Sequence, residues 1–264
     1  MKISNFLIFH ESSLLQRFRL VIGLSLFITS CGVGNLPWGQ ATPEDARFIN
    51  IVPRGSESGI STQLQVEAGE DLHLQLARNE CCYAWVEIEA NVGWSLAKPV
   101  QGVSIDADSG LLHVQDDVAN GTSLRVVAWV GTGQKFEEDV TVFTAEANPF
   151  VGIWQEVAQL SCETEEELGV LDPIRELVFY ADGSMRITWF PFEIYVDYGG
   201  EYRFADGSLT LVPREILYLP QFIDPTGSYS FEDAGRLVLS DLWLGTPPNR
   251  PNAPVNCGHI FAPR

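Results

Sequence analysis

The chain of 264 residues is long enough for two domains of about 100–150 residues each. Hydrophobic residues make up 45% of it and charged residues 19%, which is the composition of a globular protein. The formal net charge of −19 argues against a nucleic-acid partner and against docking on anionic lipid, because both need a basic surface.

The first 31 residues have the composition of a secretory signal. Lys2, Arg17 and Arg19 precede an apolar stretch over residues 20–28, and small residues follow it. The apolar stretch is shorter than the roughly 20 residues that a membrane-spanning helix needs. We therefore expect residues 1–31 to be a helical export signal.

A cysteine follows the apolar stretch. The segment Ile28-Thr29-Ser30-Cys31 resembles the bacterial lipobox, and this resemblance implies that Cys31 is acylated and becomes the mature N-terminus. More than one acyl chain gives durable anchoring. Gly32 favours the outer membrane within that family, and residues 32–46 then form a linker. The alternative is an ordinary signal peptide in which Cys31 is incidental.

Residues 47–146 alternate between apolar and polar side chains in short runs. Strict alternation is typical of strands with one buried and one solvated face, and about seven such strands indicate a β-sandwich. The predicted strands are 63–67, 72–76, 83–90, 103–105, 111–114, 123–130 and 136–143.

Two motifs in this region suggest a family. Val103-Ser104-Ile105-Asp106-Ala107-Asp108-Ser109-Gly110-Leu111-Leu112, followed by Gly121-Thr122, resembles bacterial immunoglobulin-like and cadherin-like modules. The resemblance implies a spacer, adhesion or partner-binding module. Asp106 and Asp108 leave two alternatives, a hairpin turn or a calcium loop, and the missing later ligands favour the turn.

Residues 147–264 contain a repeated Asp-Gly turn. Tyr180-Ala181-Asp182-Gly183-Ser184 recurs as Phe204-Ala205-Asp206-Gly207-Ser208, and a looser copy covers 231–237. Asp-Gly between alternating apolar runs predicts hairpins, and successive hairpins make a meander that removes its open edges by closing into a barrel.

Gly152-Ile153-Trp154 opens this second region and resembles the start of lipocalin-like proteins. The resemblance implies an antiparallel barrel with a small apolar ligand in its mouth. A short barrel filled by its own side chains is the favoured alternative. Residues 157–173 are expected to be a charged insertion, and no long C-terminal helix is evident.

Five cysteines are present, and an oxidising compartment permits disulfides. With Cys31 acylated, we predict a Cys162–Cys257 bridge, because both residues lie in the second region. Cys81 and Cys82 could form a strained vicinal bridge, stay free, or link two chains.

No set of residues indicates catalysis, a metal or a cofactor. Histidines are scarce and lack zinc-ligand spacing, and residues 55–59 place Glu57 where a nucleophile elbow needs serine. The acids at 163 and 165–167 are more typical of a solvated face than of glycosidase chemistry.

Aromatic residues gather between positions 189 and 202. They could line a barrel mouth and stack on a lipid-like ligand or a sugar, or they could belong to the core. The candidate ligand-binding residues are Trp189, Phe190, Phe192, Tyr195, Tyr198 and Tyr202.

Together these features predict an all-β protein with an immunoglobulin-like sandwich (47–146), a lipocalin-like barrel (147–264) and a helical signal segment. The predicted function is that of an exported, outer-membrane lipoprotein acting as a non-catalytic binding module. Its expected partners are the membrane through Cys31, a small apolar or glycan ligand and an envelope protein, with no nucleic acid. The alternatives are a carrier of a small apolar ligand and, less favoured, a carboxylate-dependent glycan hydrolase.

Overall fold

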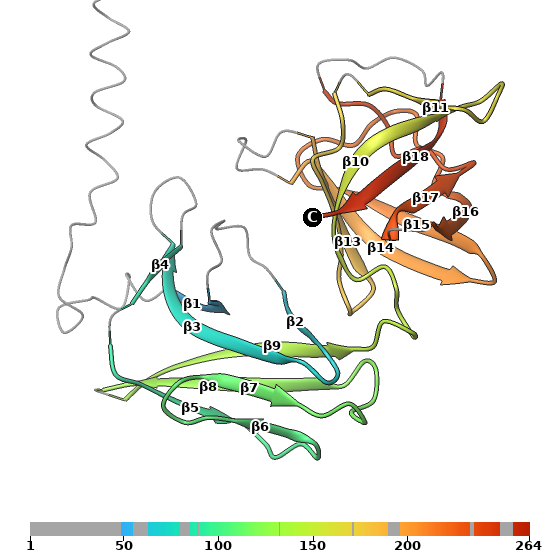
Figure 1. Cartoon of the computed structure of the whole chain (residues 1–264). Helices are drawn as coiled ribbons and strands as arrows, with labels where there is room; N and C mark the ends of the chain where they lie inside the picture. The colour runs from blue at the N-terminus through green and yellow to red at the C-terminus, as the bar shows by residue number, and fades with distance from the viewer. Residues whose placement is uncertain are drawn as a thin grey trace, which may run out of the picture.

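The computed structural model describes nine stretches of the chain, and every structural statement below refers to these residues. They are 49–54, 63–79, 85–88, 90–131, 133–170, 172–189, 196–232, 235–248 and 256–264. The predicted signal segment 1–31, the lipidation site Cys31, the linker 32–46, Cys81 and Cys82 lie outside them. Across the described residues the protein is all-β, as predicted (Figure 1).

The first half of the described chain forms two sheets. One has the strand order β1-β3-β7-β6, with β4 also paired to β3, and the other has the order β2-β9-β8-β5. The strands are β1 (Ile49–Pro53), β2 (Leu64–Glu67), β3 (Asp71–Asn79), β4 (Trp85–Glu87), β5 (Val92–Leu96), β6 (Val103–Ile105), β7 (Leu111–Val114), β8 (Ser123–Val130) and β9 (Gln134–Phe143).

Buried residues of both sheets form one hydrophobic cluster. Leu74 and Leu76 of β3 and Leu112 of β7 meet Trp94 of β5 and Val126 of β8 in it. Alternation along each strand places these side chains on the inner face. Except for the single indole of Trp94, the buried members of this core are aliphatic.

Two sequence predictions for this half need correction. The strand expected over 83–90 is described only as β4, Trp85–Glu87, with Ile88 and Ala90 outside it. Strand β5 was not among the predicted strands, because Asn91 and Gly93 interrupt the alternation around Trp94.

The hairpin between β6 and β7 is confirmed, and its turn is closed by a carboxylate. Asp106 Oδ1 accepts hydrogen bonds from the main-chain N–H groups of Asp108 (3.2 Å) and Ser109 (2.7 Å) and from Ser109 Oγ (2.7 Å). These bonds lower the pKa of Asp106. Asp106 Oδ1 is the oxygen that a calcium loop would direct at a cation, and here it accepts the hydrogen bonds of the turn instead.

The second half is a closed antiparallel barrel. Its strands are β10 (Gly152–Ser161), β12 (Glu176–Phe179), β13 (Ser184–Thr188), β14 (Tyr198–Ala205), β15 (Ser208–Glu215), β16 (Thr226–Phe231), β17 (Leu237–Ser240) and β18 (Asn256–Pro263). Each pairs with the next in the chain, and β18 returns to pair with β10, so eight strands close (Figure 1). Strand β11 (Glu167–Leu168) pairs with the end of β10, outside the closed ring.

The predicted Asp-Gly turns connect the barrel strands. Gly183 between β12 and β13 and Gly207 between β14 and β15 have φ of +85° and +78°, and Asp206 has φ of +50°. These are the conformations that glycine and aspartate tolerate best. The looser third copy joins β16 to β17, so the meander is confirmed.

The charged insertion is shorter than predicted. Residues 157–161 continue β10, and only the segment after Ser161 leaves the barrel. The acids at 163 and 165–167 are exposed, as expected for a solvated face. The predicted disulfide is confirmed, because Cys162 and Cys257 are bonded at the ends of β10 and β18.

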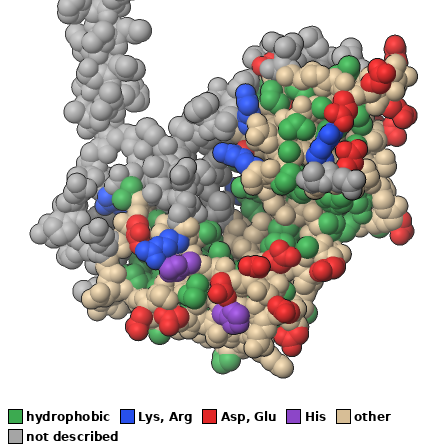
Figure 2. All heavy atoms as spheres, viewed as in Figure 1, with side chains coloured by type: hydrophobic (Ala, Val, Ile, Leu, Met, Phe, Trp, Pro, Cys, Tyr) green, Lys and Arg blue, Asp and Glu red, His purple; other side chains and the backbone are tan. Residues whose placement is uncertain are grey.

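Polar contacts join the two halves beside the covalent connection. Gln63 Nε2 donates to Asp182 Oδ2 (2.9 Å) and Gln63 Oε1 accepts from Ser184 Oγ (3.2 Å). Gln65 Oε1 accepts from the main-chain N–H of Ala181 (2.9 Å). Two glutamines at β2 therefore hold the first Asp-Gly turn of the barrel. Figure 2 shows acidic side chains spread over both halves on the face in view.

Candidate functional site

The candidate aromatic residues that the structure describes lie in the barrel core. Trp189 is 2% exposed, Tyr198 0% and Tyr202 4%, and all three belong to the interior cluster. Their burial agrees with the core alternative of the prediction, in which the rings pack inside the barrel. Phe190, Phe192 and Tyr195 lie outside the described residues.

The hydroxyl groups of the two buried tyrosines are used inside the barrel. Tyr198 OH donates to the carbonyl of Leu244 (2.6 Å), and Tyr202 OH donates to the carbonyl of Tyr180 (2.8 Å). Asn148 Nδ2 donates to the same Tyr202 oxygen (2.7 Å). Burial raises the pKa of Tyr198 well above its usual value and that of Tyr202 to about 12.

Phe150 fills one part of the barrel interior with aromatic contacts. Its ring centroid lies 4.7–5.4 Å from those of Phe179, Phe204, Tyr229 and Phe231. Edge-on and tilted arrangements of this kind are favourable for aromatic pairs. A short barrel can be filled by its own side chains, and the described residues of this one follow that alternative.

A buried acid–base pair closes the seam between β10 and β18. His259 Nδ1 lies 2.6 Å from Glu156 Oε1, and neither side chain is exposed. The main-chain N–H of Leu244 donates to His259 Nε2 (3.0 Å), so Nε2 carries the lone pair and Nδ1 carries the proton that Glu156 accepts. Trp243 stacks on the imidazole at 4.5 Å.

Glu156 receives two further hydrogen bonds. The main-chain N–H of Ile174 donates to Oε2 (2.7 Å) and Gln159 Nε2 donates to Oε1 (3.0 Å). Gln159 reaches the same face as Glu156 because the pairing of β10 with β18 shifts by one residue at Val157. The carboxylate is thus held by three donors, which is the condition for burying a charge.

This pair has the components of a general base, but its geometry is that of a structural element. A base needs a free ring nitrogen that faces a substrate, whereas Nε2 of His259 is occupied by a main-chain donor. Sequence reasoning missed Glu156 altogether. The available signal was an acid at an inward position of an apolar strand, two residues after Trp154.

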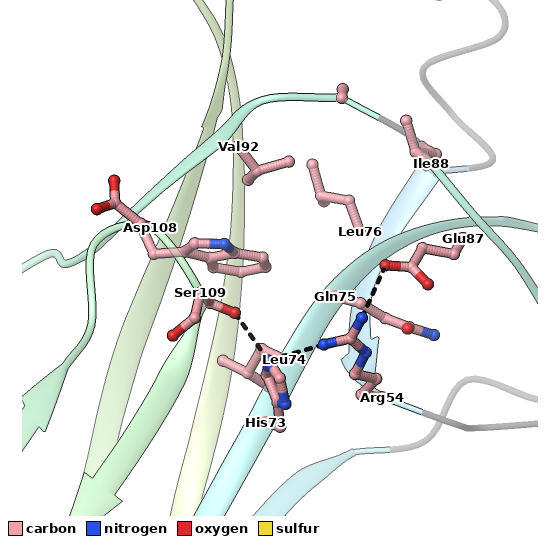
Figure 3. A pocket seen from close by; sticks show the side chains of 12 residues that line it. Arg54, His73, Leu74, Gln75, Leu76, Glu87, Ile88, Val92, Asp108 and Ser109 are labelled. Atoms are coloured by element: carbon pink, nitrogen blue, oxygen red, sulfur yellow. Dashed lines mark hydrogen bonds and ion pairs between the residues drawn. The ribbon is translucent and has the colours of Figure 1, made fainter.

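A surface hollow of about 180 Å³ lies on the first half of the molecule (Figure 3). It is lined by Arg54, β3, the end of β4, β5 and the turn before β7. Arg54 Nη1 lies 3.3 Å from His73 Nε2 and Arg54 Nη2 lies 3.8 Å from Glu87 Oε1. Of the lining residues, Asp108 was considered from the sequence, as a calcium ligand, but the hollow itself was not predicted because its lining comes from separate strands and turns.

The described residues contain neither a cluster of metal ligands nor a membrane-spanning helix. Within those stretches, no three His, Cys, Asp or Glu side chains lie close enough together to hold a metal ion. In the same part of the chain, no helix has the length and apolar character needed to cross a membrane.

Comparisons with known proteins give no family. No family model matches the chain, and no curated protein matches it. One solved structure, of a protein of unknown function from Bacteroides ovatus, aligns over 82% of this chain and 93% of its own at 10% identity, with a TM-score of 0.25. A likeness at that TM-score establishes neither the fold nor the function of this chain.

Proposed function

We propose that the protein is a lipid-anchored bacterial envelope protein that acts as a binding or interaction module through its outer surfaces. The observation that carries this proposal is the core of the barrel. Aromatic and aliphatic side chains of the described strands fill it, and the Glu156–His259 pair is buried with its own hydrogen bonds. Such a barrel is a rigid support, which leaves the surface of the molecule for recognition.

The strand order of the first half supports an immunoglobulin-like module. Constant-type immunoglobulin domains place strands A-B-E-D in one sheet and C-F-G in the other. Here β1-β3-β7-β6 and β5-β8-β9 follow that order, while β2 and β4 are additional. Modules of this kind serve as spacers and binding surfaces, and that role agrees with a position between an anchor and a barrel.

The filled interior weighs against a carrier of an apolar ligand in the barrel. A lipocalin-like carrier needs an interior space that takes up the ligand. Phe150 and the rings around it occupy that position among the described residues. A fluorescent fatty acid should therefore show no saturable one-to-one binding to the purified chain. Such binding would instead support a function as a carrier of an apolar ligand.

The anchor is tested by metabolic labelling with palmitate. Export and acylation depend on the segment ending in Cys31, so the parent chain should carry the label and fractionate with membranes. Cys31→Ser should lose the label, while Ser30→Ala, which keeps a small residue before the cysteine, should retain it. Equal labelling of the parent and Cys31→Ser would remove lipid anchoring from the proposal.

A further inference from the structure

The hollow lies where the first sheet has a gap. Strand β3 pairs with β7 through residues 71–73 and with β4 through residues 77–79. Between them, the N–H of Leu74 donates to the carbonyl of Gly110 (3.1 Å), and the carbonyl of Leu76 accepts from the N–H of Ile88 (2.9 Å). Among the described strands, β7 and β4 thus leave a gap on this edge of β3 around Gln75, while β1 pairs along the other edge.

Apolar side chains stand behind the hollow, but its accessible lining is mostly polar. Leu74 and Leu76 are 2% exposed and Trp94 is 6% exposed, so these residues add little surface to the hollow, which Val92 also lines (Figure 3). A protein cavity of about 150 Å³ takes up one benzene molecule. The volume of about 180 Å³ therefore suits a body the size of one amino-acid side chain, and it is too small for an acyl chain or an oligosaccharide.

The rim carries polar groups that cannot all be satisfied together. His73 Nε2 lies 2.9 Å from the carbonyl of Ser109 and 3.3 Å from Arg54 Nη1. One ring nitrogen either donates to the carbonyl or accepts from the guanidinium, and it cannot do both. The shorter contact assigns the proton to Nε2, which leaves the nearby N–H of Arg54 facing another donor.

Among the described residues, Glu87 forms a long ion pair with Arg54. Glu87 Oε1 lies 3.8 Å from Nη2, beyond the roughly 2.7–2.9 Å of a charge-assisted hydrogen bond. Asp108 also lines the hollow (Figure 3). The guanidinium of Arg54 therefore stands at the hollow with long contacts to His73 and Glu87, which a closer acceptor could replace.

We propose that this hollow binds a small carboxylate of about the size of one amino-acid residue, the chemistry of the carboxyl-terminal residue of a peptide. The carboxylate accepts from the planar fork of Arg54, and the rest of the ligand occupies the hollow. The site supplies a ligand class for the binding role proposed above and so depends on it. Its test, however, is independent of the lipid anchor, so the two can fail separately.

Calorimetry on the purified full chain tests the site with two matched probes. N-acetyl-leucine carries the carboxylate, and N-acetyl-leucinamide has the same body without the charge. The acid should bind saturably at one site, and the amide should bind at least about tenfold more weakly, because a hydrogen-bonded ion is lost. Equal affinity for both probes, or no saturable binding of the acid, would overturn the proposal.

Three variants assign the binding to the hollow. Arg54→Gln should lower the affinity for the acid by about tenfold and leave the amide unchanged. Glu87→Gln should tighten binding of the acid, because it removes a competing carboxylate. Arg203→Gln, which alters an exposed arginine of the barrel, should match the parent. An unchanged affinity of Arg54→Gln for the acid, with the thermal transition of the parent, would refute the site.

Discussion

The two halves of this protein bury different kinds of groups. The core of the first half is aliphatic apart from Trp94, and its charged groups remain at the surface. The barrel buries aromatic rings, tyrosine hydroxyls and the Glu156–His259 pair, and these hydroxyls and this pair are hydrogen-bonded inside. The comparison suggests that polar contacts inside the barrel help to specify it, whereas the polar contacts of Arg54 lie at the surface, where a ligand can reach them.

The largest effect should come from removing one partner of the buried pair. His259→Phe leaves the carboxylate of Glu156 without its imidazole donor and the N–H of Leu244 without its acceptor. The free energy of unfolding of the barrel should fall by about 3–5 kcal/mol in urea denaturation. The double variant Glu156→Leu/His259→Phe should lose less than the sum of the two single variants. Strict additivity would contradict the network.

Loss of the disulfide should come next. Cys162 and Cys257 are separated by 95 residues, so the bridge constrains a long segment of the unfolded barrel. Replacing both cysteines by serine should lower the free energy of unfolding by about 2–4 kcal/mol. The effect should be confined to the barrel, as judged by residue-resolved hydrogen exchange. Equal loss of protection in the first half would show that the two halves unfold as one.

Gly110 tests the core of the first half. Its φ is +73°, and a Cβ there would lie 2.7 Å from Trp94 Cε2 and 3.0 Å from the carbonyl of Leu74. Gly110→Ala should therefore cost about 1–3 kcal/mol through backbone strain and displacement of the indole. Gly121→Ala is the matched control, because its φ is +79° with no atom within 4 Å. A cost no greater than that of the control would show that Trp94 moves freely.

High pH should lower the stability of the barrel more than that of the first half. The pKa of Tyr202 rises from 10.0 to about 12 because its phenol is buried. A raised folded pKa gives stability that is complete below the unfolded value and is lost as the pH rises through the folded one. The barrel should thus weaken between about pH 10 and pH 12, as monitored by tyrosinate absorbance and by circular dichroism. A first half that melts earlier than the barrel in this range would contradict the contrast.

The smallest effect is expected at Arg54. Its side chain is 54% exposed and its contacts are long, so Arg54→Gln should change the free energy of unfolding by no more than about 0.5 kcal/mol. Thermal denaturation would measure this change. A large destabilisation would make Arg54 a structural residue instead of a binding group.

The sequence predicted those parts of the fold that depend on neighbouring residues. Asp182-Gly183 and Asp206-Gly207 encode their turns locally, and the meander follows from them. The closure of the barrel was also predicted from the meander, but the contact between Glu156 and His259 spans 103 residues. The hollow needs Arg54, β3, β5 and the turn at Ser109 together. Alternation within one strand carries no information about contacts between strands that are distant in the sequence. The buried pair and the hollow were therefore not predicted.

The central claim is that recognition takes place on the first half while the barrel is filled by its own side chains. Mapping of amide shifts by NMR during titration with N-acetyl-leucine tests it most directly. We expect the amide shifts of Leu74, Leu76, Ile88 and Ser109 to change while those of β12 to β18 stay constant. Shift changes along the barrel strands, with none in β3, would contradict the claim.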